Sequence, residues 1–261
     1  MKSNLSRDEV RKDVDLMLWA ADLAMIRRYL DMTYWELEAR EEYLADSARS
    51  GPRLESVADH SWHLCDCILL LSPRFPGLDS NKCLQLAVLH DKLELLIGDL
   101  SPMGQSGTGH DGTAYNSSLA SAKRAAEIEA LSEYVAALPE EVARAQRSLL
   151  EDYLHERSPE AKFVRAVDRL QVYTWLIRKK GGRITNAHLT FSIRYLREGV
   201  ARFPALLRYS DEFEERLLAM VAKARGVTIS ELELEINLQN IRQQTTVKIM
   251  PEADLTHVYR Q

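Results

Sequence analysis

The chain has 261 residues, of which 46% are hydrophobic and 28% are charged, and its formal net charge at pH 7 is −5. This length is enough for one large domain or two small ones with a substantial core. The mild acidity argues against any general attraction to nucleic-acid polymers or anionic membrane surfaces.

Cysteine usage and hydropathy indicate the compartment. Cys65, Cys67 and Cys83 lie inside apolar helical patterns, as small core residues of a reducing compartment do. The first residues, MKSNLSRDEVRKDVDL, contain no apolar run of the signal-peptide kind, and no stretch reaches membrane-spanning length. We therefore expect a cytoplasmic protein with no membrane partner.

Helical periodicity recurs along the chain, and no stretch shows the alternation typical of strands. The expected helices cover residues 7–31, 33–48, 56–72, 81–97, 118–138, 140–156, 158–180, 186–202, 211–225 and 229–243. The helix over 158–180 has Ser158 as its N-cap and Pro159 in its first turn. From Thr245 onward we expect an irregular tail or a short strand. The pattern predicts an all-α fold.

One segment interrupts this pattern. Residues 101–118 read SPMGQSGTGHDGTAYNSS, and their glycines and serines disfavour regular structure. A glycine-rich loop next to a functional site is typical of a lid.

The stretch 84–102 carries the first chemical signal. When residues 81–97 are placed on one helix, His90, Asp91 and Glu94 fall on the face that also holds Leu86 and Ala87. Polar groups on such a face are costly unless they are paired or bind a metal. An imidazole and two carboxylates within reach of one point suit a divalent cation. The alternative is a set of charged residues at the edge of an amphipathic face.

The same pattern recurs in two other predicted helices. His60 lies within the apolar stripe of residues 56–72, and Asp168 lies within that of residues 158–180. Each could be a satisfied core polar residue. Together with His90 and Asp91, however, they form a two-His, two-Asp set from three helices, which suits a six-coordinate metal with positions open for water and substrate.

The combined motifs resemble those of the HD-domain metal-dependent phosphohydrolases, and most of all their 5′-deoxynucleotidase branch. These motifs are Glu55-Ser-Val-Ala-Asp-His60-Ser61, His90-Asp91-x-x-Glu94, Gly98-Asp99-Leu-Ser-Pro102 and Ala166-Val-Asp168-Arg-Leu170. The resemblance implies an HD-domain helical bundle, here with N- and C-terminal helical extensions. It also implies one divalent metal ion (Mn, Co, Fe or Mg) and hydrolysis of nucleoside or deoxynucleoside 5′-monophosphates, as well as a homodimer. The metal ligands by this resemblance are His60, His90, Asp91 and Asp168.

The resemblance also implies roles for three further residues. Glu94 matches the family's catalytic carboxylate, and Asp99 matches the acidic residue of its Gly-Asp turn. The branch has an upstream arginine that holds the phosphate. Arg53 and Arg49 are the candidates here, and we prefer Arg53 because it precedes Glu55.

We expect three parts: an N-terminal helical extension over 1–52, the metal-binding core over 53–180, and C-terminal helices with a tail over 181–261. Two other functions remain to be distinguished. A nucleotide sensor or assembly protein on the same scaffold would have no turnover, whereas an oxygenase with two irons needs additional histidines. Only His110 and His155 lie between His90-Asp91 and Asp168.

Overall fold

The computed structural model describes residues 6–8, 10–11, 14–15, 18, 57–100, 102–104, 106–136, 138, 140–180, 182 and 184–249. The expected helix over 33–48, the choice between Arg49 and Arg53, and the tail beyond residue 249 lie outside these residues. The described residues of the expected helix over 7–31 include Val10 and Val14, which are helical and buried in the main core.

Every regular element of the described part is helical, which confirms the all-α prediction. The α-helices are α3 (Val57–Leu71), α4 (Ser80–Leu89), α5 (Glu94–Ile97), α6 (Ser117–Ala136), α7 (Glu140–His155), α8 (Pro159–Trp175), α9 (Asn186–Val200), α10 (Leu207–Arg225), α11 (Ile229–Glu235) and α12 (Leu238–Ile249). A π-helical turn, Leu176–Lys180, extends α8. None of these helices is long and apolar enough to cross a membrane.

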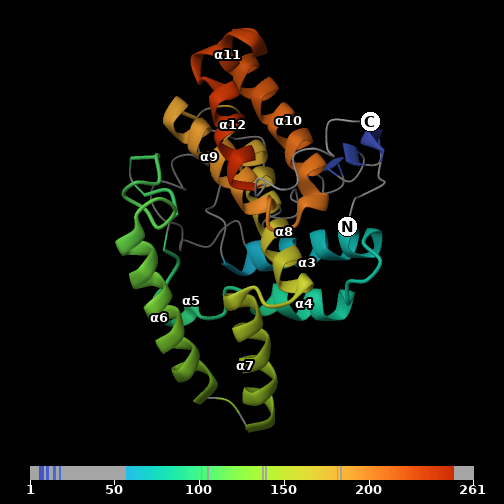
Figure 1. The fold of residues 1–261 in the computed structure, drawn as a ribbon, viewed down its shortest axis with the longest axis vertical. Helices are drawn as coiled ribbons and strands as arrows, with labels where there is room; N and C mark the ends of the chain where they lie inside the picture. The colour runs from blue at the N-terminus through green and yellow to red at the C-terminus, as the bar shows by residue number, and fades with distance from the viewer. Residues whose placement is uncertain are drawn as a thin grey trace, which may run out of the picture.

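Helix α8 lies at the centre of the fold (Figure 1). It packs against α3 and α4 on one side and against α9 and α10 on another. Three aromatic rings from separate parts of the chain, Phe75, Phe163 and Phe203, meet in the main core with centroids 5.1–5.5 Å apart. Residues of α8 therefore have neighbours from most of the molecule.

Helices α6 and α7 pack against each other and extend away from the main core (Figure 1). Their apolar side chains form a second buried cluster with Leu89 and Leu93, which flank the His90-Asp91 pair. The segment that carries this pair is therefore buried in both cores: Leu86 and Ala87 belong to the first, and Leu89 and Leu93 to the second.

A polar junction joins α4, α7 and α8. The Lys82 ammonium lies 2.8 Å from Asp152 and 3.4 Å from Glu160. Asp152 also accepts hydrogen bonds from the backbone N–H and the hydroxyl of Ser158, at 2.8 and 2.7 Å. Ser158 in turn caps α8 by accepting from the Ala161 amide, as the sequence predicts.

Two expected elements are wrong in detail. The helix expected over 229–243 is divided into α11 and α12 at Asn237, whose φ of 52° lies in the left-handed region that asparagine tolerates. The tail expected from Thr245 is helical as far as Ile249, because α12 continues to that residue. The hydroxyl of Thr245 is buried and donates to the Ile241 carbonyl within that helix.

Candidate active site

The helix expected over 81–97 is also wrong, because it is broken at the residues that carry the chemistry. Helix α4 ends at Leu89, and α5 begins at Glu94. The Ala87 carbonyl oxygen lies 2.8 Å from Nδ1 of His90 and accepts its proton. A continuous helix would need that oxygen for the Asp91 amide. Hydrogen bonds between residues three apart replace the α-helical pattern here: the Glu94 amide donates to the Asp91 carbonyl at 3.0 Å.

The structure brings three of the expected ligands together. One nitrogen or oxygen atom from each of His60, His90 and Asp91 lies within 4.8 Å of the other two. The Nε2 atoms of His60 and His90 are 3.1 Å apart. Oδ2 of Asp91 lies 2.9 Å from Nε2 of His90 and 3.5 Å from Nε2 of His60. Helix α3 and the turn after α4 thus converge on one point.

Hydrogen bonds at the far side of the two imidazole rings determine the protonation of the nitrogen atoms that face each other. Nδ1 of His60 lies 2.8 Å from Oε1 of Gln171, and Nδ1 of His90 bonds the Ala87 carbonyl. Both acceptors require a proton on Nδ1, so in the neutral rings each Nε2 carries a lone pair. Two lone pairs and a carboxylate oxygen that face one another repel unless a cation lies between them. A single proton satisfies only one such contact, whereas a divalent ion satisfies all of them, so these residues fit a metal.

Asp168, from α8, is adjacent to this group. Its Oδ1 lies 3.2 Å from Nε2 of His60, and its Oδ2 lies 3.4 Å from Nη1 of Arg169. Burial disfavours the charged carboxylate, but the positive charge of Arg169 opposes this effect, and the pKa of Asp168 is lowered. Asp168 is therefore an anion at neutral pH, as a metal ligand must be.

Glu94 and Asp99 both line the pocket beside these residues. Burial raises the pKa of Glu94 to about 8, and the charges of Asp91 and Asp99 add to the rise. A carboxyl group in this range can take up and release a proton near neutral pH. Asp99 follows Gly98, whose φ of 72° ends α5, so the predicted Gly-Asp turn is present.

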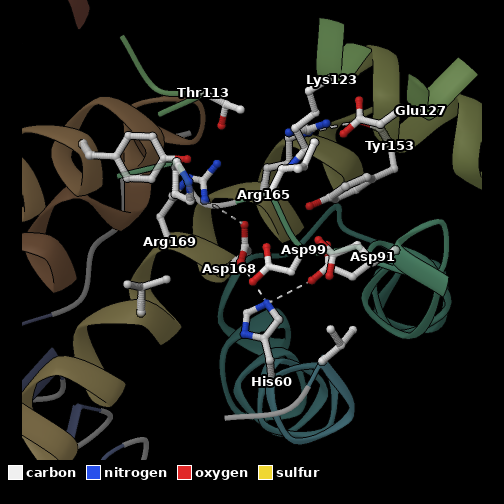
Figure 2. A pocket seen from close by; sticks show the side chains of 16 residues that line it. His60, Asp91, Asp99, Thr113, Lys123, Glu127, Tyr153, Arg165, Asp168 and Arg169 are labelled. Atoms are coloured by element: carbon white, nitrogen blue, oxygen red, sulfur yellow. Dashed lines mark hydrogen bonds and ion pairs between the residues drawn. The ribbon is translucent and has the colours of Figure 1, made fainter. Parts of the chain in front are cut away.

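The pocket has a volume of about 310 Å³, and the side facing His60 is lined by cationic and aromatic residues (Figure 2). These residues come from α6, α7, α8 and α9: Lys123, Tyr153, Arg165, Arg169 and Tyr195. The Tyr153 ring lies edge-on to the His90 ring, with centroids 5.7 Å apart. Glu127 of α6 lies on this side as well, so the acidic residues near Asp91 face a mostly basic surface across a small polar cavity (Figure 2).

The glycine-rich loop forms another wall, to which it contributes Pro102 and Thr113. The Tyr115 ring packs against Phe191 of α9, with centroids 5.8 Å apart, and its hydroxyl donates to Glu198 at 3.3 Å. These contacts anchor to α9 the segment that the sequence suggested as a lid.

The other histidines near the site or considered from the sequence have different surroundings. His63 is buried, and its Nδ1 accepts from Nε2 of Gln171 at 3.2 Å, so it lies behind His60. His155 accepts from Arg124, and His110 is an exposed loop residue against Tyr115; neither lines the pocket.

Several residues of the site were missed from the sequence, among them Tyr153 and Arg165. Gln171 follows Asp168 by one helical turn, and a buried amide in an apolar run was the available signal. Arg169 stood in the quoted motif next to Asp168, yet nothing in the local sequence shows that it lines the same pocket.

Comparisons with known proteins show which family the chain belongs to. The family model described as "HD domain" matches residues 40–207. The chain is similar to the 5′-deoxynucleotidase HDDC2 of Mus musculus, with 27% identity over 48% of this chain and 55% of that protein. It is 24% identical to HDDC2 of Xenopus laevis over 68% and 81%, and 29% identical to the 5′-deoxynucleotidase hdd1 of Schizosaccharomyces pombe over 45% and 54%. The chain spans about half the length of the mouse and yeast relatives that it matches.

The family model covers well over half of the chain, including every residue of the pocket, and the helical fold agrees with it. The chain belongs to the HD domain family.

Proposed function

We propose that the protein is a metal-dependent phosphohydrolase that releases phosphate from a nucleotide, most simply a nucleoside or deoxynucleoside 5′-monophosphate. The observation that carries this proposal is the pair of Nε2 lone pairs of His60 and His90, 3.1 Å apart and next to Asp91. The relatives are named as 5′-deoxynucleotidases, which supports a nucleotide substrate.

In this proposal His60, His90, Asp91 and Asp168 hold one divalent ion. Two imidazole nitrogens and two carboxylates suit Mn, Co or Fe. Mg is the alternative, although as a hard cation it prefers oxygen ligands. When bound, such an ion supplies a Lewis acid for a phosphoryl oxygen and lowers the pKa of water.

Glu94 is the proposed general base and acid. It takes a proton from the water that attacks phosphorus, and it returns that proton to the sugar oxygen when the P–O bond breaks. Asp99, which lines the same pocket, accepts hydrogen bonds from the sugar or from ordered water. The proposed phosphate contact of Arg53 lies outside the described residues.

The alternative functions find less support. A centre with two irons needs more histidines at the pocket, and neither His110 nor His155 lines it. A sensor without turnover has no need of a carboxyl group placed like that of Glu94.

We also propose a homodimer, on the basis of the apolar faces expected for residues 7–31 and 33–48, of which Val10, Val14 and Leu18 are already buried within one chain. The cysteine usage supports a cytoplasmic location. Static light scattering at micromolar concentration should give about twice the chain mass of 29.8 kDa. A mass of one chain contradicts this proposal.

One assay tests the function. Inorganic phosphate release is measured from ribo- and deoxyribonucleoside mono-, di- and triphosphates, each with Mn, Co, Mg and Fe, for the wild type and for Asp91→Ala. We expect metal-dependent release from monophosphates by the wild type alone. Equal release by both proteins, or none by either, contradicts the proposal.

A further inference from the structure

The pocket contains a set of cations to which the sequence assigned no firm role. Lys123 comes from α6, and Arg165 and Arg169 come from α8, one helical turn apart. Figure 2 shows all three on the opposite side of the pocket from His60. Helical residues four positions apart lie on one face, so both arginines of α8 project toward the same cavity.

Arg169 occupies a slot formed by α9. Its guanidinium lies over the Tyr195 ring, 4.4 Å from the centroid. Its aliphatic stem passes Gly199 so closely that a Cβ at that glycine would lie 2.8 Å from Cδ and nearer still to Cγ. The Tyr195 ring and the space left beside Gly199, both on α9, hold the guanidinium in one orientation.

This slot puts Arg169 next to the proposed metal position. The Asp168 carboxylate joins the two, because Oδ1 lies 3.2 Å from Nε2 of His60 and Oδ2 lies 3.4 Å from Nη1 of Arg169. The positive charge of Arg169 also acts on Asp91. Any anion that contacts the metal position therefore lies within reach of this guanidinium.

Arg165 is held in a similar way beside Tyr153. Its guanidinium lies 4.4 Å from the centroid of the Tyr153 ring, and its Nε donates to the Tyr153 carbonyl at 3.1 Å. The Tyr153 ring itself contacts His90. Arg169 is thus ion-paired with one proposed metal ligand, Asp168. Arg165 is separated from another, His90, by the Tyr153 ring alone.

We propose that Arg169 and Arg165 bind the phosphate group of the substrate in this pocket, with Arg169 contacting an oxygen beside the metal position. This inference rests on the proposed function, since it names the residues that receive the reacting phosphate. A dianionic phosphate entering beside Asp91, Glu94 and Asp168 meets strong repulsion unless cations compensate it. Arginine supplies two parallel N–H donors that match phosphate oxygens.

A purely structural role for Arg169 makes a different prediction. If the guanidinium only neutralises Asp168, then its removal should disturb the metal ligands and leave phosphate affinity unchanged once metal is restored. The test therefore measures metal content and phosphate affinity on the same preparations.

The variants are Arg169→Met, Arg169→Lys and Gly199→Ala, with Arg157→Met as the control. Arg157 is an exposed arginine near the start of α8 that does not line the pocket. Gly199→Ala removes no functional group and needs no positive φ, and the atoms nearest to the added Cβ all belong to Arg169. Calorimetric titration with inorganic phosphate gives affinity for each metal-loaded protein, and phosphate inhibition gives a second value.

We expect Arg169→Met to weaken phosphate binding roughly 10- to 100-fold with full metal content, the size of a charge-assisted contact. Arg169→Lys should lose less, Gly199→Ala should weaken binding several-fold, and Arg157→Met should match the wild type. Unchanged phosphate affinity in Arg169→Met, or loss of its metal, overturns the inference. Titration needs no turnover, so a wild type that binds phosphate through Arg169 but hydrolyses no nucleotide would contradict only the proposed function.

Discussion

Gln171 accepts the Nδ1 proton of His60 at 2.8 Å while its own amide donates to His63 at 3.2 Å. The buried His63 thus contacts the nitrogen of the Gln171 amide, while the amide oxygen faces Nδ1 of His60 and leaves Nε2 of His60 toward the pocket. A chain of three side chains, none of them exposed, controls a proposed metal ligand.

Replacing Gln171 by Met should lower metal affinity about 10- to 100-fold, because such supporting hydrogen bonds orient the imidazole and set its tautomer. Competition with a chelator of known affinity measures the change. Gln171→Glu keeps an acceptor for His60 and should lose less. Equal metal affinity in the wild type and the Met variant would show that the tautomer is set in another way.

His90→Ala and Asp91→Ala should each lose metal and activity together, because each removes a proposed ligand atom from the group around His60. Elemental analysis of the purified proteins measures occupancy. His155→Ala, which changes a histidine outside the pocket, should keep both. Full occupancy in either ligand variant refutes the assignment.

Glu94→Gln separates chemistry from binding. The variant should retain metal and nucleotide affinity, since Glu94 is not one of the three convergent groups. Its kcat should fall by roughly 10²–10⁴-fold, the usual size of general acid–base catalysis. Metal content, nucleotide affinity and kcat are measured on one preparation. If the metal is lost, Glu94 is a ligand; if kcat is near normal, the base is another group.

The junction at Asp152 should make stability depend on pH. Burial opposes the charged form of Asp152, but hydrogen bonds from Lys82 and Ser158 outweigh it and lower the pKa of this carboxyl. The unfolded chain then binds the proton more tightly, so the stabilisation is complete above the ordinary pKa of 3.8 and is lost as pH falls through the folded value.

We therefore expect Asp152→Asn to destabilise the protein by roughly 1–3 kcal/mol at pH 7. The difference from the wild type should begin to shrink as pH falls below about 4, because the unfolded wild-type chain takes up a proton there, and it should disappear only below the lowered pKa of the folded state. Urea unfolding of both proteins between pH 7 and pH 3 measures it. A difference that is constant over this range would assign the effect to packing alone.

The sequence predicts the helices well because a period of 3.6 residues is a local signal. It also predicts the convergence of His60, His90 and Asp91, because metal-ligand side chains on apolar faces are unusual. The break at His90 depends on a side chain that takes the Ala87 carbonyl, which no periodicity records. The role of Arg169 is hidden for another reason: the groups that hold it, Tyr195 and Gly199, lie on a different helix.

The two separate cores have a consequence for substrate choice. Leu89 and Leu93 attach the turn that bears His90 and Asp91 to the cluster under α6 and α7, whereas His60 and Asp168 belong to helices of the main core. The cavity thus lies where the two hydrophobic clusters meet. A substitution in the smaller cluster, at Leu131 or Leu150 for instance, can shift the turn that bears His90 and Asp91 and so change the width of the cavity. Selectivity could then evolve at positions that never touch the substrate, with the reactive groups left intact.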